Sequence, residues 1–157
     1  MKFALDTGVL LASVKRRDEK YFLPAYHLVS KLKKAGHQAI ISILVIEELR
    51  GGLASSTTMP SEKIFEVEAS LQNILEPMII SYDSCVEKTR ELLLSFRDLK
   101  RRKDIPSADF HHIATAILEN ADLFVTIDEK HLLASETRER LSGVIRIINP
   151  EEAMESV

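Results

Sequence analysis

The sequence contains one cysteine and no long run of apolar residues. Because Cys85 stands alone, an internal disulfide and a metal cluster built on several cysteines are excluded, and a reducing compartment is favoured. No stretch approaches the roughly 20 apolar residues that a membrane-spanning helix needs. The N-terminal residues also contain no apolar segment of signal length. We therefore expect a cytoplasmic protein with no membrane association.

Glycine and proline are scarce, with five of each, which argues against long linkers. The 157 residues, 45% hydrophobic and 29% charged, predict one domain over residues 1–157 with a good core. Aromatic residues make up only 6% and are scattered, so we predict no stacking platform for a single-stranded nucleic acid. The net charge of −3 disfavours a protein that coats DNA non-specifically.

Short apolar segments alternate with amphipathic ones along the whole chain. The strands are expected at residues 2–6, 39–41, 78–80, 123–125 and 144–148. The helices are expected at residues 9–14, 18–35, 43–50 and 61–75, from Ser84, from Ser107, at 129–141 and after Asn149. This alternation is typical of an α/β domain with a mostly parallel sheet covered on both faces.

Local signals set several of these boundaries. The glycine pair at 51–52 is expected to end the helix 43–50, whose Ile43 should face inward. Ser84, with Glu87 three residues later, has the spacing of a capping box and predicts a helix start.

Acidic residues follow the predicted strands or lie near predicted helix starts. They are Asp6, Glu48 (or its neighbour Glu47), Asp109 and Asp128. Asp109 heads a helix whose apolar residues follow at spacings of four, seven and eight, so its carboxylate lies in line with a core stripe. The carboxyl ends of parallel strands open into the ligand crevice of such folds. We therefore expect these carboxylates to meet in one pocket.

Carboxylates gathered in one pocket cannot all stay ionised unless a cation is present. A site made only of carboxylate oxygens suits Mg²⁺ or Mn²⁺. Such an ion polarises a phosphoryl group and activates water, so phosphodiester hydrolysis is the chemistry that this pattern favours.

The same residues, taken in order, resemble the PIN domain family. The resemblance is carried by residues 5–11 (LDTGVLL), 42–49 (SILVIEEL), 107–116 (SADFHHIATA) and 125–128 (VTID). It spans essentially the whole chain and implies a three-layer α/β/α sandwich with a mostly parallel central sheet. PIN domains are metal-dependent ribonucleases, and many are VapC-type toxins that a partner antitoxin holds inactive.

The resemblance implies a site as well as a fold. Asp6, Glu48, Asp109 and Asp128 would hold Mg²⁺ or Mn²⁺ and activate water for RNA cleavage, with the hydroxyl of Thr126 beside them. Thr7, in the turn after Asp6, is a supporting residue. Glu48 is preferred to Glu47 because the glutamate of the family directly precedes a leucine. An RNA substrate, an antitoxin and a homodimer are the implied partners.

Two positions depart from the family pattern. Gly8 stands where many members have asparagine, and His131 stands where many have a further aspartate. Of the adjacent histidines, His111 and His112 point about 100° apart on a helix and cannot share a metal. His112 lies three residues after Asp109, near the expected pocket, but we assign it no catalytic role.

Two other functions stay open at this point. A signalling module that accepts phosphate needs paired acids after its first strand, whereas Asp6 stands alone there. A catalytically weak PIN-fold scaffold that binds RNA or a protein partner would keep the fold without cleavage. For an RNA substrate, the basic residues at 15–17 and 100–103 are candidate contacts, although both runs also suit a solvated surface.

Overall fold

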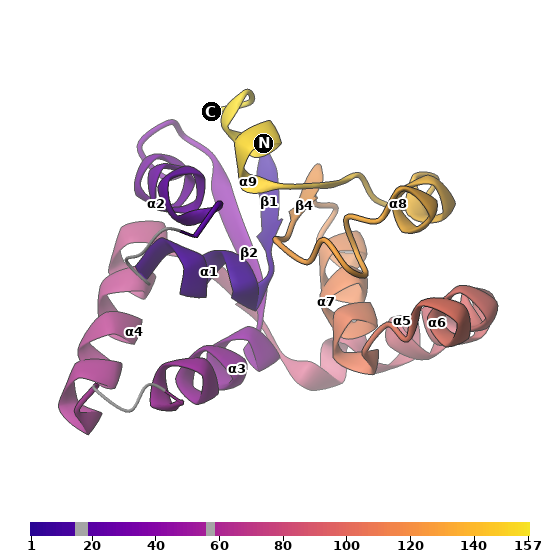
Figure 1. Cartoon of the computed structure of the whole chain (residues 1–157), viewed down its shortest axis with the longest axis horizontal. Helices are drawn as coiled ribbons and strands as arrows, with labels where there is room; N and C mark the ends of the chain where they lie inside the picture. Colours follow the sequence, from indigo (N-terminus) through magenta and orange to yellow (C-terminus); the bar gives the residue numbers. More distant parts are fainter. Residues whose placement is uncertain (15–18, 56–58) are drawn as a thin grey trace.

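The computed structural model describes residues 1–14, 19–55 and 59–157, in which a parallel five-stranded sheet lies between two groups of helices (Figure 1). The basic residues 15–17 and the centre of the expected loop at 55–60 lie outside these ranges. No helix in these ranges has both the length and the apolar character needed to cross a membrane.

The strands and helices alternate as the sequence predicts. The strands are β1 (Lys2–Leu5), β2 (Gln38–Ser42), β3 (Met78–Ile80), β4 (Leu123–Val125) and β5 (Ile147–Ile148). The helices are α1 (Thr7–Val14), α2 (Phe22–Lys31), α3 (Ile43–Ala54), α4 (Ser61–Leu75), α5 (Tyr82–Ser95), α6 (Arg97–Lys103), α7 (Ser107–Leu118), α8 (Ser135–Leu141) and α9 (Pro150–Met154).

The strand order places β1 in the middle of the sheet. The order is β3-β2-β1-β4-β5, and every neighbouring pair is parallel. Phe3 of β1 pairs with Ala39 on one side and with Leu123 on the other. The direction of winding therefore reverses between β1 and β4. In an open α/β sheet, ligands bind at the carboxyl ends of the strands beside such a reversal.

Alternate residues of β1 pack into two separate cores. Phe3 and Leu5 face the side covered by α1, α2, α3, α4 and α9. Ala4 faces the opposite side, where α5, α6, α7 and α8 supply the core residues. This period of two follows from the pleat of a strand. The α/β/α layering expected from the sequence is thus confirmed (Figure 1).

The predicted end of α3 at the glycine pair is wrong. The helix continues through Gly51 and Gly52 to Ala54. A Cβ atom on Gly52 would lie 2.7 Å from Cδ1 of Leu11, so this glycine lets α3 approach α1 closely. Ile43 is exposed rather than inward, and Val45 takes a buried place instead.

The expected helix starts after β3 and after β4 also need correction. Helix α5 begins at Tyr82 with Ser81 as its N-cap, so Ser84 lies inside the helix and forms no capping box. The expected helix at 129–141 is helical only over Ser135–Leu141. Backbone and side-chain oxygens of Asp128 bind the chain that follows it, which holds that segment in turns.

Two further elements, one helix and one strand, are shorter in the structure than the sequence predicts. The helix expected at 18–35 is confined, within the described residues, to Phe22–Lys31. Gly36, at φ +77°, lies in the turn that leads from it to β2, a conformation that favours glycine. The last strand covers Ile147–Ile148 rather than 144–148, because Val144 and Ile145 donate their N–H groups back to Leu141.

Candidate active site at the carboxyl edge of the sheet

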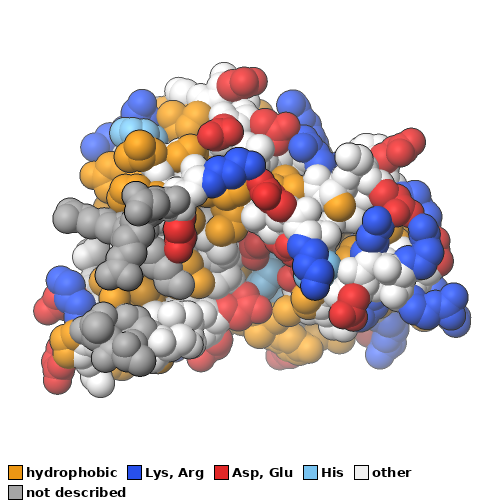
Figure 2. Space-filling model, in the orientation of Figure 1, with side chains coloured by type: hydrophobic (Ala, Val, Ile, Leu, Met, Phe, Trp, Pro, Cys, Tyr) orange, Lys and Arg blue, Asp and Glu red, His pale blue; other side chains and the backbone are white. Residues whose placement is uncertain are grey.

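The predicted acids come from elements that meet at the carboxyl edge of the sheet. Asp6 follows β1, and Asp128 lies three residues beyond the end of β4. Glu48 lies in the second turn of α3, and Asp109 in the first turn of α7. Figure 2 shows acidic and histidine side chains gathered near the middle of one face of the molecule.

Asp6 is held in place by its neighbours on the sheet edge. Its Oδ1 accepts the backbone N–H of Thr7 at 2.8 Å, and its Oδ2 accepts the hydroxyl of Thr126 at 2.7 Å. Burial raises the pKa of this carboxyl, although His112 and these two hydrogen bonds act in the opposite direction. The Asp6 side chain therefore has a fixed orientation, and burial disfavours its ionised form.

Thr126 connects two of the acids. Its side chain is fully buried, and its hydroxyl donates to Asp6 while accepting the backbone N–H of Asp128 at 3.1 Å. The ends of β1 and β4 are thereby joined through one hydroxyl. The structure thus places this predicted supporting residue between Asp6 and Asp128.

Glu48, rather than Glu47, turns toward the cluster. Glu48 Oε2 accepts the hydroxyl of Thr7 and lies 3.0 Å from Nε2 of His112. The hydrogen bond from His112 lowers the pKa of Glu48 most, burial opposes it, and the Thr7 hydroxyl lowers it further. Glu47 instead accepts a hydrogen bond from Arg50 at 2.8 Å on the exposed side of α3.

His112 is the site residue to which the sequence analysis assigned no role. It is buried, and its Nδ1 lies 2.9 Å from the hydroxyl of Ser42 while its Nε2 faces Glu48. Burial alone acts to lower the pKa of His112, but Glu48, Asp6 and Asp109 outweigh it, so the pKa is raised. Three acidic neighbours thus favour a cationic imidazole within the cluster. Its position three residues after Asp109 is the sequence signal for this role.

Asp109 differs from the other three acids of the cluster in its hydrogen bonds. Within the described ranges, no donor forms a hydrogen bond with its side chain, although the residue is partly buried. Burial, followed by the charges of Asp6 and Asp128, raises its pKa to about 7, while His112 and His131 act against the rise. A nearby positive charge would therefore change the state of Asp109 strongly.

The Asp128 carboxylate also contacts a histidine, His131. Its Oδ1 accepts the backbone N–H of His131 at 3.0 Å, and its Oδ2 lies 2.8 Å from Nδ1 of the same residue. His131 is one of the two departures from the family pattern, and here it binds a member of the acidic cluster.

Gly8, the other departure, is explained by packing. A Cβ atom at this position would lie 2.8 Å from Cγ1 of Ile127, which fills the space next to Asp6. An asparagine at position 8 would therefore require Ile127 to move.

The basic run at 100–103 is less available than its sequence suggests. Arg102 and Lys103 both form ion pairs with Glu136, and Lys100 donates to the carbonyl of Ile105. These contacts stabilise the α6–α8 side of the molecule. The run therefore offers an RNA backbone less free positive charge than four basic residues imply.

The donor set fits a hard divalent cation by its chemistry. In the described part of the chain, no group of three or more His, Cys, Asp or Glu side chains is placed so that it could hold a metal ion by itself. Burial and the negative charge of Asp6 nevertheless raise the pKa of Asp109, and burial raises the pKa of Asp6 itself. Mg²⁺ is commonly held by one or two carboxylates and keeps several waters, so a complete cage of protein ligands is not required.

These features define an α/β protein with an acidic cluster beside the reversal of its parallel sheet. The PIN domain family model matches residues 3–136, and the chain belongs to this family. No curated protein matches the sequence.

Solved structures show the same fold at low sequence identity. The VapBC2 structure from Rickettsia felis, bound to a DNA fragment from its promoter, is 19% identical with a TM-score of 0.62, over 95% of this chain and 98% of that one. FitAcB from Neisseria gonorrhoeae is 20% identical with a TM-score of 0.62, over 96% and 99% of the two chains. VapBC-1 from nontypeable Haemophilus influenzae is 13% identical with a TM-score of 0.62, over the same shares.

Proposed function

We propose that this chain is a metal-dependent endoribonuclease that hydrolyses RNA phosphodiester bonds. The observation that carries the proposal is the meeting of four carboxylates at the sheet edge, among which the pKa of Asp109 is raised to about 7. Such a group gains most from a cation that neutralises it. Membership of the PIN domain family supports a nuclease over the signalling module that the sequence left open.

In this proposal the acids have different tasks. Asp6 and Asp109 hold Mg²⁺ or Mn²⁺, and Asp128 and Glu48 complete the site through the ion or its waters. The ion, when bound, polarises the scissile phosphoryl group and lowers the pKa of the attacking water. Thr126 and Thr7 fix the orientations of Asp6 and Glu48 through the hydrogen bonds described above.

We also propose that the protein acts in the cytoplasm as the toxin of a toxin–antitoxin pair, as a homodimer. The PIN family resemblance and the VapBC and FitAB structural neighbours support this assignment. A protein partner also suits the large apolar side chains that α2 and α4 leave exposed. These are Leu23, Tyr26, Phe65 and Ile74.

A scaffold without catalytic activity is the second candidate. It is favoured by one observation, namely that Glu48 and Asp128 are already bound by His112 and His131. In such a protein the histidines would take the place of a metal ion, and RNA or a partner would bind without being cut.

Cleavage of a mixed RNA pool distinguishes the two candidates. The wild type and Asp109→Asn are compared in Mn²⁺, in Mg²⁺ and in EDTA, and Glu48→Gln is compared with its neighbour Glu47→Gln. We expect cleavage by the wild type only with metal. Asp109→Asn should lose more than about a hundredfold in rate, because even partners outside the metal's first shell of ligands are worth about 10- to 100-fold. Glu48→Gln should lose activity and Glu47→Gln should keep it.

Two results would reject the nuclease. Metal-independent cleavage that persists in Asp109→Asn would place the activity elsewhere or in a contaminant. RNA binding without any cleavage by the wild type would support the scaffold.

A further inference from the structure

A hollow lies on the α5–α7 side of the molecule and has no task in the proposed chemistry. Its volume is about 380 Å³. It is lined by Tyr82, Val86, Thr89, Arg90, Leu93, Leu94 and His111. All of them except His111 belong to α5, and His111 belongs to α7.

One wall of the hollow is a pair of stacked rings. The Tyr82 and His111 rings lie 4.7 Å apart between centroids and are inclined by only 11°. His111 is buried, whereas Tyr82 is 51% exposed. The imidazole therefore supports the phenol ring while leaving much of that ring open. The pair was not visible from the sequence, because its members lie 29 positions apart.

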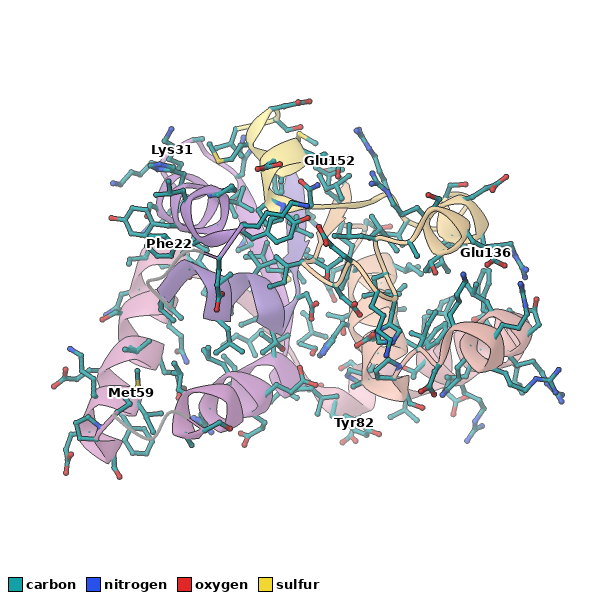
Figure 3. The ribbon with its side chains drawn as sticks, viewed as in Figure 1. Phe22, Lys31, Met59, Tyr82, Glu136 and Glu152 are labelled. Atoms are coloured by element: carbon teal, nitrogen blue, oxygen red, sulfur yellow. The ribbon has the colours of Figure 1, made fainter. Side chains whose placement is uncertain are left out.

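The stacked pair stands beside the candidate active site. Ile80, at the end of β3, pairs with Ser42, at the end of β2, so Tyr82 lies just beyond the carboxyl edge of the sheet. Figure 3 shows Tyr82 at the lower edge of the molecule, near the first turns of α7. The His111 ring lies 6.5 Å from the ring of His112, whose Nε2 binds Glu48. A contiguous set of side chains thus joins the hollow to the acids.

Polar groups in the hollow lack strong partners. The Nδ1 of His111 lies 3.3 Å from the hydroxyl of Thr89, but its buried Nε2 has no hydrogen-bond partner among the described residues. The Arg90 guanidinium lies 3.4 Å from Glu87 in a highly exposed pair. Exposed pairs of this kind are weak, so Arg90 remains available to a ligand anion.

We propose that this hollow, which we call the Tyr82 shelf, binds one nucleotide of a single-stranded RNA next to the cleaved bond. The base stacks on Tyr82, the apolar side chains of α5 contact its edge, and Arg90 binds a backbone phosphate. Stacking on aromatic rings together with a basic contact is the general means by which proteins hold single strands. This inference rests on the proposed ribonuclease function.

A second copy of the chain is the competing occupant of the shelf. An interface between copies buries about 800 Å² on each partner and is usually apolar at its centre. The shelf instead combines an aromatic ring with a cation and an unpartnered imidazole nitrogen, beside acids suited to a phosphodiester. This composition favours the nucleotide.

The first test measures RNA binding without cleavage. In the Asp109→Asn background, a fluorescent single-stranded RNA oligonucleotide is titrated in Mg²⁺ with Tyr82→Ala, with Tyr82→Phe and with the control Tyr26→Ala. Tyr26 is 49% exposed on α2, so its loss removes a similar ring from another surface. We expect Tyr82→Ala to weaken binding about tenfold, as loss of one stacked base does. Tyr82→Phe and Tyr26→Ala should stay within about twofold.

The second test locates the stacked base. In the otherwise wild-type protein, Tyr82→Ala should raise KM about tenfold with little change in kcat, because stacking stabilises the bound substrate and the transition state alike. An abasic RNA lacking one base near the cleavage position should lose about as much with the wild type. It should then lose little more with Tyr82→Ala, because the two changes remove the same contact.

Three outcomes would overturn the shelf. If the wild type cleaves RNA and Tyr82→Ala binds and cleaves RNA equally well, the shelf does not bind a nucleotide, and the proposed ribonuclease function is unaffected. If Tyr82→Ala turns a dimer into a monomer in analytical ultracentrifugation, this face belongs to an interface between copies. If the wild type neither binds nor cleaves RNA, the proposed function and the shelf fail together.

Discussion

The pKa values of two carboxyl groups in one cluster, Glu48 and Asp109, are shifted in opposite directions. Glu48 accepts hydrogen bonds from the Thr7 hydroxyl and His112, and the pKa of its carboxyl is lowered. Asp109 has no such donor among the described residues, and its pKa is raised to about 7. Both acids have His112 as a neighbour, but its hydrogen bond is the largest influence on the pKa of Glu48, whereas burial is the largest influence on the pKa of Asp109.

The difference follows from where each side chain lies. Glu48 is 39% exposed and reaches across from α3 to the start of α1 and to α7. Asp109 lies in the first turn of α7, where the helix dipole favours a negative charge by at most about 1–2 kcal/mol, which does not offset burial. The protein thus supplies hydrogen-bond donors to Glu48, whereas the charge of Asp109 has to be balanced by a cation from outside the chain.

Neutralising Asp109 should stabilise the protein in metal-free buffer at alkaline pH. A carboxyl whose pKa rises from 3.8 to about 7 on folding favours the folded state less and less as the pH rises from about 4 to 7. Asp109→Asn removes this loss, so at pH 8 we expect it to be more stable than the wild type by about 2–4 kcal/mol. At pH 4 the two proteins should unfold at similar temperatures. Thermal unfolding in EDTA at both pH values measures the difference.

Asp98→Asn is the matched control for this experiment. In the wild type, a hydrogen bond with Arg140 lowers the pKa of the Asp98 carboxyl to about 2. The contribution of Asp98 to folding stability is therefore present above pH 3.8 and is lost as the pH falls toward 2. At pH 8 this substitution should therefore lower the unfolding temperature slightly. An Asp109→Asn variant that is destabilised at pH 8 as well would show that Asp109 is satisfied in the folded protein.

Removing His112 should leave Glu48 with the Thr7 hydroxyl as its one remaining hydrogen-bond partner among the described residues. We expect His112→Ala to lower the free energy of unfolding by about 1–3 kcal/mol, because the Ser42 hydroxyl and Glu48 lose their partner. The partial exposure of Glu48 favours the lower half of this range. RNA cleavage should fall about 10- to 100-fold, as it does when a residue that orients a metal ligand is lost.

A double-mutant cycle separates orientation from packing in this result. If His112 acts through Glu48, its loss should matter much less in a Glu48→Gln background than in the wild type. The exposed residue His27 supplies the control His27→Ala, which should change neither stability nor cleavage. Equal losses in the two backgrounds would mean that His112 serves the core alone.

The fold could be predicted from the sequence, and the acids could be picked out as candidates, for a simple reason. Apolar runs of three to five residues and amphipathic segments are local patterns, and both survive in the observed elements. Asp6 and Asp128 follow strands, and Asp109 opens a helix, so each position could be recognised without knowing its partners. Parallel strands then bring such residues to one edge wherever the chain places them.

The partners of these acids could not be found in the same way. His112 binds Glu48 across 64 positions of sequence, and Tyr82 stacks on His111 across 29. Such pairs depend on how α3, α5 and α7 pack together and on the rotamer of each side chain. The end of α3 shows the same limit, because Gly52 serves the contact with Leu11 rather than a helix end.

The pair of His131 and Asp128 should be the weaker of the two histidine–carboxylate pairs. His131→Ala removes the contact from Nδ1 at 2.8 Å, but the backbone N–H of residue 131 still binds Asp128 at 3.0 Å. Because the pair is partly exposed, we expect a loss of at most about 1 kcal/mol in stability. Titration with Mn²⁺ should show an affinity reduced by no more than about tenfold, against an unchanged value for His27→Ala. If His131→Ala lowered stability as much as His112→Ala does, Asp128 would depend on His131 as strongly as Glu48 depends on His112. The contrast between Glu48 and Asp109 would then hold between Asp128 and Asp109 as well.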